Sequence, residues 1–141
     1  MVVYEGLIFF TARDESHGVE LWRTDGTPEG TRMVRDIRPG SRGSAPTGLT
    51  VSGGRLWFSA NDGDHGVELW TSDGTTTGTR LAVDIAPGSF SSEPRALVDR
   101  GGTLLFLAEN MTHGFELWLA GDWLFADGFE IGSADAWANS H

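Results

Sequence analysis

The six residues HGVELW stand at His17–Trp22 and return unchanged at His65–Trp70. A third version, HGFELW, occupies His113–Trp118, so that consecutive copies lie 48 residues apart. Aligned without gaps, the segments 9–56 and 57–104 share 26 of 48 residues. A period of this length is typical of propellers, solenoids and other tandem-repeat folds. The chain therefore consists of three tandem copies of one structural unit.

Composition and charge narrow the classes of ligand. The 141 residues carry a net charge of −10. Binding to nucleic acid or to an anionic membrane surface needs a basic face, so neither is expected. No stretch approaches the ~18 apolar residues of a membrane span, and no membrane insertion is expected. The chain has no cysteine, which excludes disulfide bonds and thiolate metal sites. A cationic ligand, calcium or a neutral sugar is compatible with this charge.

The second copy shows how one unit divides into strands. Gly53-Gly54 separates two apolar runs, which is typical of a two-residue hairpin whose central residues both need positive φ. The loop 61–65, the Asp73-Gly74-Thr75 turn and the Pro/Gly/Ser-rich segment 86–94 mark the other boundaries. We therefore predict an antiparallel meander followed by a connector, with strands at 47–52, 55–60, 66–71 and 79–85.

The apolar pattern separates two all-β architectures. A strand of a β-sandwich buries one face and alternates apolar with polar residues. Here Leu56-Trp57-Phe58 and Leu104–Leu107 are apolar on both faces of the strand. A sheet covered on both faces fits a blade wedged between neighbouring blades. Because four strands per ~48 residues also match propeller repeats, we predict an all-β fold of β-propeller-type blades, built from three four-stranded antiparallel meanders.

The repeat also sets the predicted boundaries. They are blade 1 at 1–37, a connector at 38–46, blade 2 at 47–85, a connector at 86–94, blade 3 at 95–126 and a C-terminal tail at 127–141. The third copy lacks the long Asp-Gly-Thr hairpin, so a turn at Gly121-Asp122 and a closing strand at Trp123–Ala126 are expected in its place. Propellers have about 4–8 blades. Three blades therefore belong to a longer array, which the strand-like run at Met1 favours, or form a six-bladed homodimer.

The repeated sequence resembles a known family. The segments ELWRTDGTPEGT (Glu20–Thr31) and ELWTSDGTTTGT (Glu68–Thr79), each followed by Asp-Ile-x-Pro-Gly, are similar to the bacterial ELWxxDGT tandem-repeat family, over about residues 1–120. The tail 127–141 is similar to short DGFESG-type C-terminal tails of exported proteins. The resemblance implies an array in a secreted or cell-surface protein, with a signal peptide upstream of this chain. It implies no general activity.

Candidate ligand-binding residues lie in the loops between the second and third predicted strands. Successive hairpins of a meander open at alternate ends of the sheet, so these loops share one rim with the connectors. Their acids, amides and imidazoles suit a glycan or a divalent cation, whereas a structural interpretation has the histidines satisfy loop backbone groups. The candidate residues are Asp14, His17, Asp62, Asp64, His65, Glu109, Asn110 and His113.

The most regular residues of the repeat are expected to be structural. Asp and Thr side chains close turns on their own backbone, and the Asp-Gly-Thr loops lack the acidic pattern of an EF-hand. A glutamate that recurs in every unit is interpreted as an inter-blade hydrogen-bonding residue, with paired catalytic carboxylates as the alternative. The residues are Glu20, Leu21, Trp22, Asp25, Gly26, Glu68, Leu69, Trp70, Asp73, Gly74, Glu116, Leu117 and Trp118.

These features favour a non-enzymatic extracellular scaffold for binding or adhesion, with a polysaccharide or protein ligand and no catalytic residue or required cofactor. The chain shows no Ser-His-Asp order, phosphate loop or HExxH motif. One alternative places the array at the C-terminus of a larger secreted hydrolytic enzyme. A second alternative has calcium stabilise the repeats through the Asp-rich loops. Aromatic residues outside the repeat (Trp123, Phe129 and Trp137) are further candidates for stacking on sugars.

Overall fold

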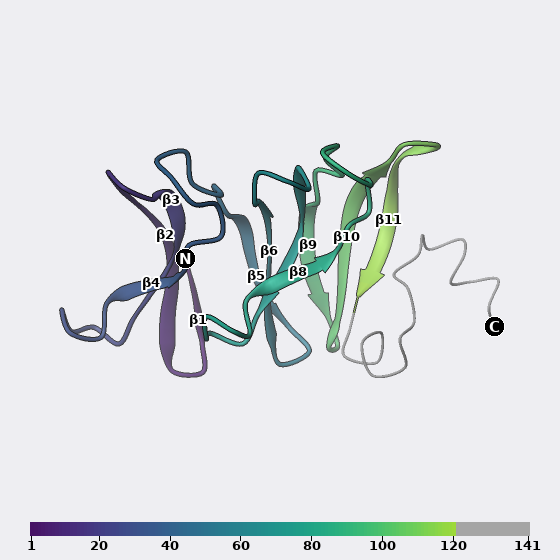
Figure 1. Ribbon diagram of the computed structural model, residues 1–141. Helices are drawn as coiled ribbons and strands as arrows, with labels where there is room; N and C mark the ends of the chain where they lie inside the picture. Colours follow the sequence, from purple (N-terminus) through teal and green to yellow (C-terminus); the bar gives the residue numbers. More distant parts are fainter. Residues whose placement is uncertain (121–141) are drawn as a thin grey trace.

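The computed structural model describes residues 1–120, which form three antiparallel sheets in chain order (Figure 1). The first sheet consists of β1 (Val2–Tyr4), β2 (Leu7–Asp14), β3 (Gly18–Thr24) and β4 (Arg32–Arg35). The second consists of β5 (Thr47–Ser52), β6 (Arg55–Asn61), β7 (Val67–Ser72) and β8 (Arg80–Val83). The third consists of β9 (Arg95–Arg100), β10 (Thr103–Asn110) and β11 (Gly114–Ala120). Each sheet is a meander in which consecutive strands pair.

These sheets confirm the all-β class and the repeated meander. In the second sheet the strands begin and end within one residue of the expected bounds, with one exception. The fourth strand of the second sheet ends at Val83 instead of residue 85. Beyond the strand, the backbone N–H groups of Ile85 and Ala86 donate to the carboxylate of Glu68. The third sheet has three strands within residues 1–120. The predicted closing strand at 123–126, the tail 127–141 and its aromatic residues lie outside the described residues.

The two-residue hairpins behave as the glycine doublet predicts. Gly53 and Gly54 have φ values of 57° and 73°, and Gly101 and Gly102 have φ values of 61° and 89°. Positive φ costs an L side chain about 1–2 kcal/mol, which glycine avoids. A β-carbon on Gly53 would also lie 2.7 Å from the carbonyl oxygen of Gly102. The doublet therefore serves both the turn and the close approach of two neighbouring sheets.

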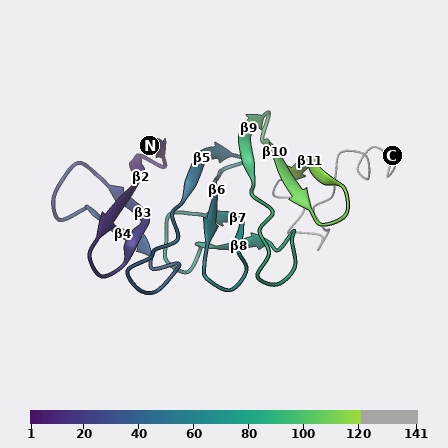
Figure 2. The ribbon, with the colours of Figure 1, turned by 90° about the horizontal axis from the view of Figure 1, so that it is seen from above.

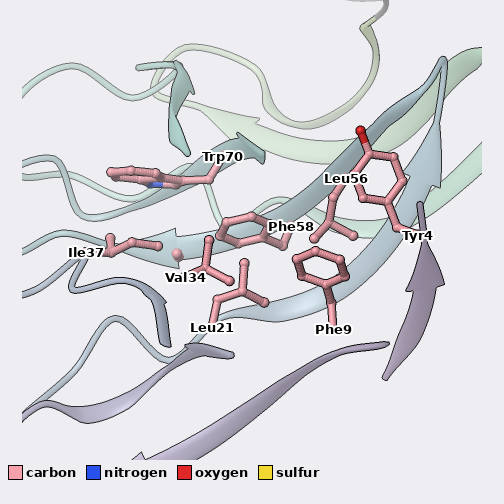
Figure 3. Close-up of a cluster of buried hydrophobic side chains, with 9 residues drawn as sticks. Tyr4, Phe9, Leu21, Val34, Ile37, Leu56, Phe58 and Trp70 are labelled. Atoms are coloured by element: carbon pink, nitrogen blue, oxygen red, sulfur yellow. The ribbon is translucent and has the colours of Figure 1, made fainter. Parts of the chain in front are cut away.

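The sheets pack face to face, and the second sheet is buried on both sides. We call the face that meets the next sheet along the chain the trailing face, and the opposite face the leading face. Leu56 and Phe58 on the leading face of the second sheet pack with Phe9 and Leu21 of the first (Figure 3). On its trailing face, Leu69 packs with residues of the third sheet, among them Leu104, Phe106 and Trp118. The prediction of strands apolar on both faces is confirmed for this sheet.

Contacts between the sheets include the first strand of each (Figure 2). The hydroxyl of Tyr4 donates to the carbonyl oxygen of Gly54 at 2.8 Å, and the hydroxyl of Ser52 donates to the carboxylate of Asp99 at 2.7 Å. Strands β1 and β5 lie in contact, as do β5 and β9. The first strand of each sheet thus contacts the first strand of the next sheet. The described residues form no closed ring.

The two outer faces of this stack remain partly exposed. Leu21 and Leu69 are fully buried by the sheet that follows them, whereas Leu117, at the same repeat position, is 42% exposed. Leu107 pairs with Leu117 on the same trailing face and is 37% exposed. On the leading face of the first sheet, Ile8 is 37% exposed. For Leu117 and Ile8 the exposure reflects the place of the residue in the array, because their repeat counterparts are fully buried.

Candidate functional site

The loops predicted to share a rim lie at the end of the sheets where the connectors cross (Figure 1). Residue 43 of the first connector forms a parallel bridge with Val19, and the backbone N–H of Ala45 donates to the carbonyl oxygen of Val19 at 3.0 Å. In the second connector, Ser92 and Glu93 donate to the carbonyl oxygen of Val67. We call this end of the structure the connector rim.

The recurring glutamates of the first two units tie the connectors to the sheets. Glu20 is fully buried and accepts hydrogen bonds from the backbone N–H groups of Arg38 and Ser44 and, at 2.5 Å, from the Ser44 hydroxyl. The carbonyl oxygen of Ser44 then accepts the N–H of Asn61 in the second sheet at 3.0 Å. Through Ser44, the carboxylate of one sheet reaches the backbone of the next.

The second unit repeats this arrangement. Glu68 accepts hydrogen bonds from the hydroxyl of Ser92 and from the backbone N–H groups of Ile85 and Ala86, and the carbonyl oxygen of Ser92 accepts the N–H of Glu109 at 2.7 Å. In the third unit, Glu116 accepts the side-chain amide of Asn110 at 2.8 Å. The structure therefore places two of the three glutamates at junctions between sheets and keeps them apart, so no pair of facing carboxylates is formed by Glu20 and Glu68.

Burial changes the titration of these carboxyl groups. Burial away from water disfavours the charged carboxylate and raises the pKa of Glu68 to about 7. The hydrogen bonds that Glu68 accepts from Ser92 and the connector backbone oppose this shift. Burial raises the pKa of Glu20 in the same way. Because the folded-state pKa of Glu68 lies above its unfolded value of about 4.3, its contribution to stability is complete below that pH. The contribution is lost as pH rises towards 7.

We therefore expect Glu68→Gln, which mimics the protonated carboxyl group, to reduce the pH dependence of stability. A pKa shift contributes about 1.4 kcal/mol per pH unit, so wild type should lose up to about 3 kcal/mol relative to the variant between pH 4.5 and pH 7.5. Urea unfolding of both proteins at those two pH values measures the change. Other titrating groups cancel in the comparison. A stability difference that is the same at both pH values would contradict the role of burial at Glu68.

Acidic and amide side chains, and not the histidine rings, satisfy the backbone of the rim loops. The carboxylate of Asp14 accepts the N–H groups of Ser16 and His17, and Asn110 accepts those of Thr112 and His113. The imidazole of His17 instead pairs with Asp14, at 2.8 Å. The expectation that the histidine rings hydrogen-bond to the loop backbone is therefore wrong for His17 and for His65. A side chain three residues before the loop ends is better placed to accept N–H groups than the ring beyond it.

Each of the first two histidine rings lies within hydrogen-bonding distance of the aspartate three residues before it. His65 lies 2.6 Å from the carboxylate of Asp62, which accepts the N–H groups of Asp64 and His65. These side-chain hydrogen bonds raise the pKa of His17 and of His65 above the ordinary value. They also lower the pKa of Asp14. Each pair thus stays local to one loop, and residues 1–120 contain no group of three or more acids and histidines that could hold a metal ion.

The Asp-Gly-Thr loops lie at the opposite end of the sheets, where third strands lead to fourth strands. Asp25 accepts the N–H and the hydroxyl of Thr27, and Asp73 accepts the same two groups of Thr75. A β-carbon at residue 78 would lie 1.9 Å from the carboxylate of Asp73. The second Gly-Thr of each motif is thereby explained, because that glycine leaves room for the aspartate. The carboxylates are occupied by turn hydrogen bonds.

A pocket on the connector rim lies at the junction of the second and third sheets. Some of the residues that line it are candidate ligand-binding residues from the sequence, and others are not. It encloses about 320 Å³ and is lined by Ala86, Phe90, Ser91, Glu109, Asn110 and Met111. The side chains of Phe90 and Met111 are 58% and 64% exposed. Sequence reasoning included Glu109 and Asn110 but missed Phe90. The available signal was an aromatic residue in a polar connector, at the repeat position where the first connector has Arg42.

The other predicted rim residues lie outside this pocket. Asp62, Asp64 and His65 belong to the loop between β6 and β7. His17 belongs to the loop between β2 and β3, and Asp14 is the last residue of β2. His113 lies in the loop that follows Asn110, the last residue of β10, and does not line the pocket. The candidate residues are thus distributed over three separate loops, of which one contributes to a pocket with an exposed aromatic side chain.

No family model, curated protein or solved structure matches the chain in comparisons of sequence and fold. Within the described residues, no helix is long and apolar enough to cross a membrane.

Proposed function

We propose that the chain is a non-enzymatic extracellular repeat scaffold that binds a polysaccharide at its connector rim. The observation that carries the proposal is the pocket that exposed Phe90 and Met111 line together with the polar residues Ser91, Glu109 and Asn110. Sugar-binding sites need an apolar surface for the C–H face of the ring and polar groups for its hydroxyls. The exposed ring of Phe90 supplies the apolar surface, and the polar residues that line the pocket beside it supply hydrogen-bonding groups.

The proposed architecture is a propeller whose blades are the three sheets. Packing of each sheet against the next, contact between first strands and a repeat of about 48 residues support it. The resemblance to the ELWxxDGT repeats supports an extracellular or cell-surface location. Closure of a ring requires further blades, either from a second copy that forms a homodimer or from more repeats in a longer chain. The native mass of the purified chain, measured by light scattering, distinguishes a dimer from a monomer.

The rim pocket is tested by replacing its aromatic residue. Phe90→Ala should weaken binding of a responsive neutral polysaccharide about tenfold, which corresponds to about 1.4 kcal/mol. The measurement is a glycan-array screen followed by calorimetric titration of the strongest neutral oligosaccharide. Phe115→Ala is the matched control, because Phe115 is also exposed, at 41%, and does not line the pocket.

Equal losses in the two variants would contradict a specific role for the rim pocket. Absence of any glycan binding by the wild-type chain would overturn the choice of polysaccharide and leave a protein ligand as the second candidate. The exposed apolar side chains of Phe90 and Met111 are the observation that favours that candidate, because such residues are also common at protein interfaces.

A further inference from the structure

Two arginines face each other across neighbouring strands of the first sheet. Arg23 of β3 and Arg32 of β4 are direct partners in the antiparallel register. Side chains of such partners project from the same face of a sheet, with β-carbons about 4.5–5.5 Å apart, and like charges placed there repel each other. The second sheet pairs Thr71 with Arg80 at the same positions. The doubled positive charge therefore belongs to the first unit alone.

Both arginines line a pocket of about 310 Å³ between the first and second sheets. Met33 and Val34 of β4 provide its apolar wall, and the loop residues Gly74, Thr75 and Thr76 close it from the second sheet. The hydroxyl of Thr76 donates to the carbonyl oxygen of Val34 at 2.7 Å, so the loop is fastened to β4. This pocket lies among the Asp-Gly-Thr loops, at the opposite end of the sheets from the connector rim.

The guanidinium groups retain hydrogen-bonding capacity that the described residues do not use. Arg23 donates through Nη1 to the carbonyl oxygen of Gly74 at 2.8 Å, which orients the side chain across the pocket. A guanidinium has five N–H donors, so most remain available. Within residues 1–120, neither Arg23 nor Arg32 forms a salt bridge with a carboxylate. Two positive charges therefore line one pocket without a carboxylate of the described residues beside them. A bound anion would relieve the repulsion between them.

We infer that this pocket binds the carboxylate of an acidic sugar, with Arg23 and Arg32 as its ligands. Guanidinium groups match a carboxylate with paired N–H donors. The pocket volume lies at the lower end of small-molecule sites, about 300–1,000 Å³, and suits one sugar unit against Met33 and Val34. The net charge of −10 does not prevent binding, because charges beyond about 8 Å are screened at physiological salt.

The experiment titrates the full chain with glucuronate, following the arginine Nε–H signals by NMR. Glucose, a neutral sugar of the same ring size, and inorganic phosphate, a small anion, are the reference probes. Wild type should bind glucuronate saturably, and at least tenfold more tightly than either reference probe. Arg23→Thr, which installs the residue of the second unit, and Arg32→Gln should each weaken glucuronate binding at least tenfold. Arg100→Gln is the control, since Arg100 is exposed and does not line the pocket.

Arg32→Gln removes an exposed side chain and one member of the like-charged pair, so it should keep the fold and raise the thermal midpoint without ligand. No saturable binding, equal affinity for glucose or phosphate, or unchanged affinity in Arg32→Gln would overturn the inference. The inference is independent of the proposed rim function, because Phe90 does not line this pocket. Phe90→Ala should accordingly leave glucuronate binding unchanged, which separates failure of one site from failure of the other.

Discussion

Replacing Trp70 with alanine should lower the free energy of unfolding by about 3–5 kcal/mol, the usual cost of deleting a large aromatic side chain from a core. Trp70 is 4% exposed and packs in the cluster between the first and second sheets (Figure 3). Its indole N–H has no hydrogen-bond partner within residues 1–120. The loss therefore measures packing between sheets and not a broken hydrogen bond. Urea unfolding followed by circular dichroism gives the value.

The repeat supplies a matched control for this experiment. Trp22→Ala removes the same residue at the same repeat position, but on the leading face of the first sheet, where no described sheet precedes it. It should cost less than half as much when measured at a protein concentration where the chain is monomeric. Equal losses in the two variants would mean that stacking of the sheets is not what stabilises the tryptophan.

Gly66→Ala should destabilise the chain by about 2–5 kcal/mol, because two costs combine. Gly66 has a φ of 72°, where an L residue is strained by about 1–2 kcal/mol. A β-carbon there would also lie 2.2 Å from the carbonyl oxygen of Phe90 in the connector, and overpacking of this kind costs about 1–3 kcal/mol. Thermal or urea unfolding measures the sum.

Gly114→Ala separates the two costs. Gly114 occupies the same repeat position with a φ of 76°, and a β-carbon there would have no neighbour within 4 Å. Its replacement should therefore show the backbone strain alone, about 1–2 kcal/mol. If Gly66→Ala costs no more than Gly114→Ala, the connector does not hold the close approach to β7 that the structure describes.

Several structural features follow from local sequence, and these were predictable. The glycine doublet at 53–54 predicts a hairpin because two successive positive φ values exclude most other residues. The 48-residue period predicts repeated meanders because similar segments adopt similar local structure. Apolar doublets such as Trp57-Phe58 predict a sheet buried on both faces, since neighbouring strand residues point to opposite sides.

Other features depend on which segments meet, and here the expectations went wrong or were incomplete. The backbone partner of the rim loops is Asp14 or Asn110 instead of the histidine that follows, a choice that depends on how the loop closes. The strand β8 ends two residues before the expected bound, and a carboxylate from β7 accepts the N–H groups of Ile85 and Ala86 beyond it. Phe90 joins Glu109 and Asn110 only after the connector crosses to the next sheet.

The sequence by itself determined the repeated all-β unit, its turns and the faces that must be buried, because each depends on residues within one 48-residue period. Only the tertiary structure decided how residues at the same repeat position differ in burial and in electrostatic surroundings. Leu69 is buried while Leu117 is 42% exposed, and Arg23 faces Arg32 across a pocket completed by the loop of another unit. The physical reason is that burial and electrostatic surroundings come from the neighbouring sheet, and a residue's own repeat does not specify which neighbour it meets.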